Sequence, residues 1–178
     1  MTQIANAYAQ GLYALAKDEG LDETVLQQLD VLCAAFREEP SFLRLLATPN
    51  LSKQERVSVL DSSFRDRVHP YVLNFLKLLT ERGKISHFSQ CCTAFREQYN
   101  TDRGILPVRA VSAVPLSEEQ VQKLTQKLEA ITGKTVELTN RVDPSCLGGV
   151  RLDYDGKRVD GTVKNRLDGI AAALINTV

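Results

Sequence analysis

The sequence lacks an excess of charge of either sign: its 178 residues include 22 Lys+Arg and 22 Asp+Glu. Nucleic-acid-binding proteins concentrate basic residues on one face or stripe. No such stripe occurs here, so we expect no nucleic-acid partner. Only the first 39 residues depart from balance, with two basic residues against seven acidic ones, a net charge of 2 − 7 = −5. We interpret this region as a solvated helix surface, with partner selection as the alternative.

Cysteine and histidine are scarce and scattered. The chain has four cysteines and two histidines, with no CxxC spacing. Zinc and redox motifs are therefore unsupported, and we expect neither a metal nor a cofactor. Each cysteine is expected to act as a small apolar residue in a reducing cytosol. His69 and His87 lack a nucleophile partner and are expected to lie at the surface or to cap helices.

Long apolar runs are missing too. A membrane-spanning helix needs about 18 or more consecutive apolar residues, and the sequence contains no such run. It also shows no targeting segment. We therefore expect contact with a membrane to be indirect, through another protein.

What the sequence does contain is a helical first part, residues 1–104. Apolar residues recur there every three or four positions, and Gly or Pro interrupts them. Ser52 followed by Glu55 predicts a capping box at the start of one helix, and Pro70 fits the first turn of the next. The pattern predicts an all-α bundle of six short helices, which end near Gly20, before Pro40, at Pro49, before Pro70, at Gly83 and near Asp102.

The second part, residues 105–178, reads as a small α+β domain. Residues 105–113 are apolar on both faces, as in a central strand. Ser117 with Gln120 predicts a capped helix whose buried stripe comprises Val121, Leu124, Leu128 and Ile131. A strand follows at 135–142, then a hairpin whose two-residue turn is Asp155-Gly156. Asp160 or Thr162 is expected to cap a last helix with an apolar face of Val163, Leu167, Ile170, Ala171 and Leu174.

Two glycine-containing segments resemble nucleotide-binding loops. Gly133-Lys134-Thr135 ends like a phosphate-binding loop, but Leu128 stands where that motif needs glycine, and this segment leaves a helix to enter a strand. Gly148-Gly149 is better explained as a strand entrance or bulge, since no helix follows it directly. A small nucleotide-binding or hydrolytic enzyme that uses either segment is therefore the alternative and not the preferred interpretation.

Two features favour a groove for a partner's helix. Gly11 interrupts the first helix at a cost of about 1 kcal/mol relative to Ala, which is easier to understand if another backbone approaches there. The helix at 70–82 is apolar around more of its circumference than a simple bundle needs. An amphipathic helix could bind such a surface, and tight packing within the bundle is the competing explanation.

A set of motifs occurs in order along the whole chain. The motifs are Ala5-x-x-Tyr8-Ala9-x-x-Leu12-x-x-Leu15-Ala16, Asn74-Phe75-Leu76-x-Leu78-Leu79-x-x-x-Gly83, Val111-x-Ala113-x-Pro115-Leu116-Ser117, Val142-Asp143-Pro144, Gly148-Gly149-Val150, Asp160-Gly161-Thr162-Val163 and Leu167. Together they resemble the delta subunit of F-type ATP synthase, the counterpart of the mitochondrial oligomycin-sensitivity-conferring protein. Thr162 departs from the resemblance by standing where the family more often has Ser.

The resemblance implies a non-catalytic stator protein at the cytoplasmic face of the cell membrane. In that family the helical domain binds N-terminal segments of the alpha subunits through its first and fifth helices, and the C-terminal domain holds the b-type stalk subunit. Carried over to this chain, the resemblance makes five residues candidates for the alpha-subunit groove: Tyr8, Gly11, Leu15, Asn74 and Leu78. A helical adaptor unrelated to the synthase is a third possibility.

Overall fold

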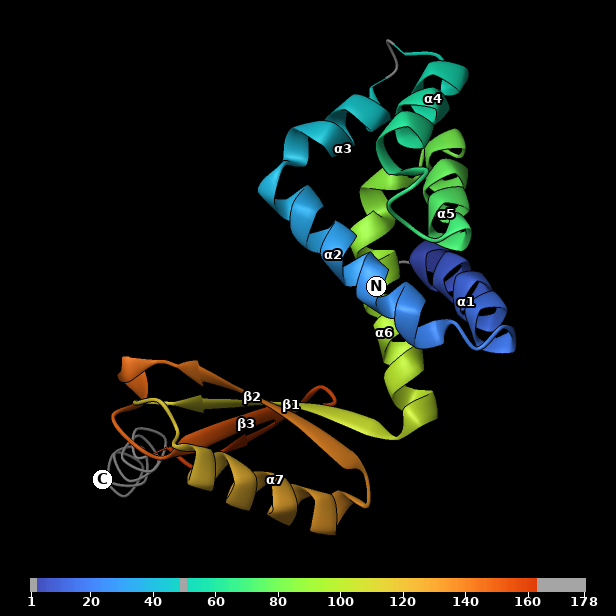
Figure 1. Ribbon diagram of the computed structural model, residues 1–178. Helices are drawn as coiled ribbons and strands as arrows, with labels where there is room; N and C mark the ends of the chain where they lie inside the picture. The colour runs from blue at the N-terminus through green and yellow to red at the C-terminus, as the bar shows by residue number, and fades with distance from the viewer. Residues whose placement is uncertain (1–2, 49–50, 163–178) are drawn as a thin grey trace. The chain divides into compact units, whose positions relative to one another are not determined.

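The computed structural model describes residues 3–48 and 51–162, and the chain divides into two compact units, residues 1–99 and 100–178. The first unit is helical and the second combines a sheet with a helix (Figure 1). This confirms the predicted order of a helical part followed by an α+β part. Gly104, where we expected the division, lies between the last helix of the first part and the first strand.

The helical part contains six α-helices and a short 3-10 helix in the described residues. The 3-10 helix, Ile85–His87, leads directly into the last α-helix, so the predicted single helix from Ile85 onward begins as 3-10 and becomes α at Phe88. The α-helices are α1 (Gln3–Asp18), α2 (Asp22–Glu38), α3 (Pro40–Ala47), α4 (Lys53–Phe64), α5 (Pro70–Glu81) and α6 (Phe88–Arg103).

Local signals fix the helix starts. Glu55 N donates to Ser52 Oγ (3.2 Å) and Ser52 N donates to Glu55 Oε2 (2.7 Å), which completes the predicted capping box of α4. The hydrogen bond from Ser52 N holds the pKa of Glu55 below its usual value. Pro70 begins α5, and Tyr71 N donates to His69 Nδ1 (3.3 Å), so His69 caps that helix. Pro49, the predicted end of the third helix, lies outside the described residues.

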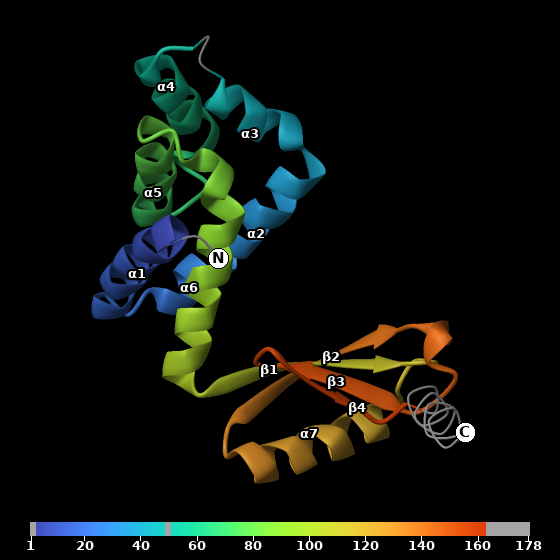
Figure 2. The same cartoon turned by 180° about the vertical axis from the view of Figure 1, so that it is seen from behind.

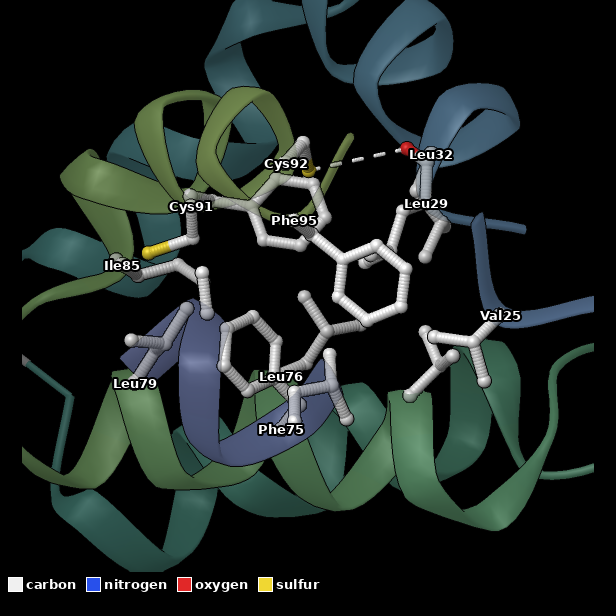
Figure 3. Close-up of a cluster of buried hydrophobic side chains, with 14 of the residues drawn as sticks. Val25, Leu29, Leu32, Phe75, Leu76, Leu79, Ile85, Cys91, Cys92 and Phe95 are labelled. Carbon is white, nitrogen blue, oxygen red and sulfur yellow. Dashed lines mark hydrogen bonds between the residues drawn. The ribbon is translucent and has the colours of Figure 1, made fainter. Parts of the chain in front are cut away.

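The core of the helical unit is one continuous cluster of buried side chains (Figure 3). Aromatic rings connect helices that are distant in sequence: Tyr13 of α1 meets Phe95 of α6 edge to face at 5.3 Å between ring centroids. Phe36 of α2 contacts Phe88 of α6 at 5.3 Å. Such pairs add about 0.5–1.5 kcal/mol to the burial of their surface, so α1, α2 and α6 are held by specific packing.

The second unit has a four-stranded sheet of order β2-β1-β3-β4. β1 (Ile105–Ser112) pairs in parallel with β2 (Thr135–Val142) and antiparallel with β3 (Val150–Tyr154), so it is a central strand, as its apolar faces predicted. β4 (Lys157–Asp160) completes the hairpin with β3. The crossover between β1 and β2 is α7 (Glu118–Thr132), which lies along one face of the sheet (Figures 1 and 2).

The predicted buried stripe of α7 is wrong at its last position. Leu128 packs with Leu106, Val108 and Val136 in the small core of this unit, but Ile131 is 81% exposed. In the last turn of α7, Glu129 faces the beginning of β2, where its Oε1 accepts a hydrogen bond from the backbone N of Val136 (3.0 Å). In the last turn of α7 it is therefore Glu129 that contacts β2, and Ile131 lies in solvent.

The hairpin turn is as predicted. Asp155 has φ 48° and Gly156 has φ 68°, the two positive values that a tight turn of this kind requires. Asp160 accepts hydrogen bonds from the backbone N (2.9 Å) and the hydroxyl (2.7 Å) of Thr162. The helix predicted after Thr162 lies outside the described residues.

Candidate functional site

α1 has two apolar faces: one lies in the core, and the other is largely exposed apart from Tyr8, which packs against the core. The buried face comprises Ala5, Ala9, Leu12, Tyr13 and Ala16. On the other face Ile4 is 41% exposed and Leu15 is 44% exposed, Gly11 is exposed and Tyr8 is half-buried. Positions 4, 8, 11 and 15 follow helical spacing and so form one stripe along the helix. We call Ile4, Tyr8, Gly11 and Leu15 the α1 stripe.

Gly11 lies in open space. Apart from its chain neighbours and the backbone of its own helix, a Cβ atom placed on it would meet no atom of the described residues within 4 Å. Packing within the bundle therefore does not explain the glycine, and that competing explanation is wrong at this position. Because Gly in a helix interior costs about 1 kcal/mol relative to Ala, its presence is consistent with the approach of something outside the chain.

α5 differs from α1 because most of its apolar side chains are buried inside the helical bundle. Its buried residues are Val72, Leu73, Phe75, Leu76, Leu79 and Thr80. Asn74 is exposed and Leu78, one turn later, is 39% exposed. Asn74 and Leu78 thus share a narrow surface strip on a helix that is otherwise in the core.

α1 and α5 pack against each other (Figures 1 and 2). The five candidate residues therefore lie on two neighbouring helices, and none of them is charged. We call the α1 stripe together with Asn74 and Leu78 the α1/α5 face. Ile4 was not among the sequence candidates, although its spacing from Tyr8 and Gly11 is a signal that could have identified it.

Two hollows in the helical unit lie away from this face. The larger, about 890 Å³, lies between α4 and α5, and charged residues such as Asp61, Arg65 and Arg82 contribute to its lining. The other, about 410 Å³, is mainly apolar and is lined by residues of α2 and of the segment around Phe64 and Val68. Neither is lined by a residue of the α1/α5 face.

The glycine segments have structural roles. Gly133 ends α7 in the left-handed conformation (φ 66°) and donates its N–H to the carbonyl of Glu129 (2.8 Å), after which β2 begins. A Cβ on Gly149 would lie 2.5 Å from the carbonyl oxygen of Gly161, so its missing side chain makes room for the chain's own backbone and not for a ligand. The nucleotide-binding alternative thus has no support from either segment.

Within residues 3–48 and 51–162, no group of three or more His, Cys, Asp or Glu side chains is placed to hold a metal ion. No helix in the same ranges has the length and apolar character needed to cross a membrane.

The chain matches the family described as ATP synthase delta (OSCP) subunit over residues 4–174. The chain belongs to the ATP synthase delta (OSCP) subunit family. Among curated relatives, the ATP synthase subunit delta of Clostridioides difficile is 31% identical over 176 residues, 98% of this chain and 97% of that protein. The ATP synthase subunit delta of Gloeobacter violaceus is 34% identical over 167 residues, 93% of this chain and 90% of that protein.

The fold agrees with a solved member of the same assembly. A chain in the cryo-EM structure of the Toxoplasma gondii mitochondrial ATP synthase hexamer superposes with a TM-score of 0.75 and 21% identity, and 98% of each chain is covered. This likeness shows that the two chains share a fold. Membership makes the chain a peripheral-stalk subunit of F-type ATP synthase.

Proposed function

We propose that this chain is a non-catalytic stator linker that joins the catalytic head of the synthase to its stalk. The helical part, a six-helix bundle, would bind N-terminal segments of the alpha subunits, and the α+β part would hold the b-type stalk subunit. Rotor torque can drive ATP synthesis and proton transport only if the head is kept from turning with the rotor. The chain's task is therefore to bind tightly at two ends, and it needs no cofactor.

The observation that carries the proposal is the α1/α5 face. Leu15 is 44% exposed and Leu78 is 39% exposed on neighbouring helices of a unit whose buried apolar residues form a continuous core. An amphipathic helix binds such a surface by burying its own apolar side chains, each worth about 1.5–3 kcal/mol. Gly11, with open space where its Cβ would be, gives that helix room to approach α1 closely.

The same proposal fixes the location of the chain. We place it at the cytoplasmic face of the cell membrane as a peripheral component of the synthase, attached to the membrane only through the stalk. We further propose that residues 1–104 and 105–178 are the two domains that serve the two ends. The clustering of the chain's contacts into residues 1–99 and 100–178 supports this division.

The test is titration of the purified full chain with a peptide of the alpha-subunit N-terminal segment, measured by calorimetry. We expect Leu78→Glu and Gly11→Leu each to weaken binding by about tenfold or more, because a buried charge or a bulky side chain then occupies the face, and tenfold is about 1.4 kcal/mol. Val31→Glu is the matched control, since Val31 is 69% exposed on α2, outside the α1/α5 face.

Equal affinity in all variants would contradict the proposed face. No affinity of the wild type for the alpha peptide, together with stable binding to another helix, would favour an unrelated adaptor. Binding or hydrolysis of ATP by the purified chain would contradict the non-catalytic assignment.

A further inference from the structure

Helices α2 and α6 run antiparallel, and three contacts between them lie in successive layers. At one end the rings of Phe36 and Phe88 meet at 5.3 Å. At the other end Asp30 forms an ion pair with Arg96. The contacting residue on α6 changes from Phe88 to Arg96, a higher number, while the contacting residue on α2 changes from Phe36 to Asp30, a lower number. The two helices therefore run in opposite directions.

Cys33 and Cys92 occupy the layer between these two contacts. The Cys92 thiol lies within 3.9 Å of the backbone oxygen of Leu29, one turn before Cys33 on α2. Each of the two thiols shifts the pKa of the other, as expected for groups in the same layer. Cys92 therefore reaches α2 at the turn that carries Cys33.

The two thiols differ in accessibility and in acidity. Cys92 is 5% exposed, whereas Cys33 is half-buried and can be reached by a small solute. The hydrogen bond from Cys92 lowers the pKa of Cys33, and Arg37 and Arg96 act in the same direction against burial and Asp30. The pKa of Cys92 is raised, first by its hydrogen bond with Cys33 and then by burial. Cys33 is thus the thiol that ionises first, and thiolates are the reactive form.

Cys91 provides a comparison within the same helix turn. Its sulfur points away from the sulfur of Cys92 and toward Ile85 (Figure 3). Burial raises the pKa of Cys91 to about 11, and it is 1% exposed. Adjacent in sequence, Cys91 and Cys92 therefore have different surroundings, and only Cys92 faces α2.

We propose that Cys33 and Cys92 are an oxidisable pair that forms an intramolecular disulfide between α2 and α6 when the protein meets a peroxide. The Cys33 thiolate attacks one peroxide oxygen and the O–O bond breaks, which gives a sulfenic acid on Cys33 and, with one proton, a molecule of water. The Cys92 sulfur then attacks Cys33 sulfur, the S–O bond breaks, and the departing oxygen takes the thiol proton as a second water. Two thiols are oxidised by two electrons, and one peroxide is reduced to two waters.

The bond would close a loop that contains α3, α4 and α5. A cross-link over such a long loop restricts the unfolded chain and raises the temperature of unfolding. We expect the oxidised helical unit to unfold about 10 °C higher than the reduced one. Formation of the bond requires the two sulfurs, which lie in one layer between the helices, to reach the S–S length of about 2.05 Å.

The experiment treats the full reduced chain with one equivalent of hydrogen peroxide, then unfolds it in guanidinium chloride and blocks the free thiols with iodoacetamide. We expect two of the four cysteines of the wild type to remain available for alkylation. The mass of the oxidised chain before alkylation should be lower by two hydrogen atoms. Digestion without reductant should yield a peptide pair linked through Cys33 and Cys92. Reduction with dithiothreitol should restore all four thiols and the lower unfolding temperature.

Cys91→Ser and Cys146→Ser are the matched controls and should still form the disulfide. Cys33→Ser and Cys92→Ser should each abolish it, and circular dichroism of the reduced variants checks their fold. Because Cys33 is only half-buried, Cys33→Ser keeps the test decisive even if Cys92→Ser fails to fold. The proposal is wrong if the wild type keeps four free thiols, if the link joins other cysteines or two chains, or if Cys33 only accumulates higher oxides.

Discussion

The two units of the chain are held together in different ways. The core of the helical unit contains 21 buried residues, whereas the core of the α+β unit, within the described residues, contains four. The α+β unit instead concentrates backbone positions with unusual geometry, among them Leu147 (φ 60°), Gly149 (φ 78°) and Asp155 (φ 48°). Within the described residues, the first unit thus has the larger packed core, and the second has more backbone positions with positive φ.

The largest effect should come from the core of the helical unit. Phe95 is fully buried and contacts Tyr13, so Phe95→Ala should lower the free energy of unfolding by about 3–5 kcal/mol. Urea denaturation followed by circular dichroism at 222 nm measures this. Val31→Ala, at a position 69% exposed, should change it by less than about 0.5 kcal/mol. Similar losses in both variants would show that packing does not dominate this unit.

The next effect should come from turn geometry in the second unit. Gly149→Ala adds a Cβ that would lie 2.5 Å from the carbonyl oxygen of Gly161, at a positive φ, and should cost about 3 kcal/mol. Gly156→Ala has a similar φ but open space around its Cβ, so it should cost only about 1 kcal/mol. Hydrogen exchange of peptides from residues 100–162 measures both. Equal costs would mean that the close approach to Gly161 does not matter.

Helix caps should matter equally in the two units. Ser52 caps α4 and Ser117 caps α7, each with a complete capping box. Ser52→Ala and Ser117→Ala should each cost about 1 kcal/mol, with the loss of amide protection confined to the first turn of the helix concerned. Ser58→Ala, at an exposed position inside α4, is the control and should be neutral or slightly stabilising. A much larger loss in one unit would show that its cap supports more than its own helix.

The smallest effect has the opposite sign. Gly11→Ala should stabilise the helical unit by about 0.5–1 kcal/mol, since the added methyl group meets nothing within 4 Å and Ala is the better helix former. The unfolding temperature of the purified chain measures it. Destabilisation would mean that Gly11 has a role in the chain's own fold.

Most of the elements were predictable because their signals are local. The Ser52–Glu55 capping box, Pro70 at the start of α5 and the Asp155-Gly156 turn each depend on residues within a few positions of one another. The apolar character of both faces of residues 105–113 similarly identified β1 as central, which its pairing with β2 and β3 confirms.

The features that the sequence did not predict depend on contacts across long stretches of chain. The proximity of Cys33 to Cys92, the backbone of Gly161 next to Gly149 and the exposure of Ile131 follow only from the placement of whole elements. Periodicity gives the face on which a residue lies but not what covers that face. For the same reason the helical pattern could not separate the buried side of α1 from the α1 stripe, both of which are apolar.

The most direct test of the stator assignment measures ATP-driven proton pumping in membranes depleted of this subunit, with a pH-sensitive dye. Added wild-type chain should restore pumping, because the head is again held against the rotor. Leu78→Glu, provided that its circular dichroism matches the wild type, should restore much less, and Val31→Glu should restore it fully. Pumping that is undiminished without the chain, or that Leu78→Glu restores as well as the wild type does, would contradict the account.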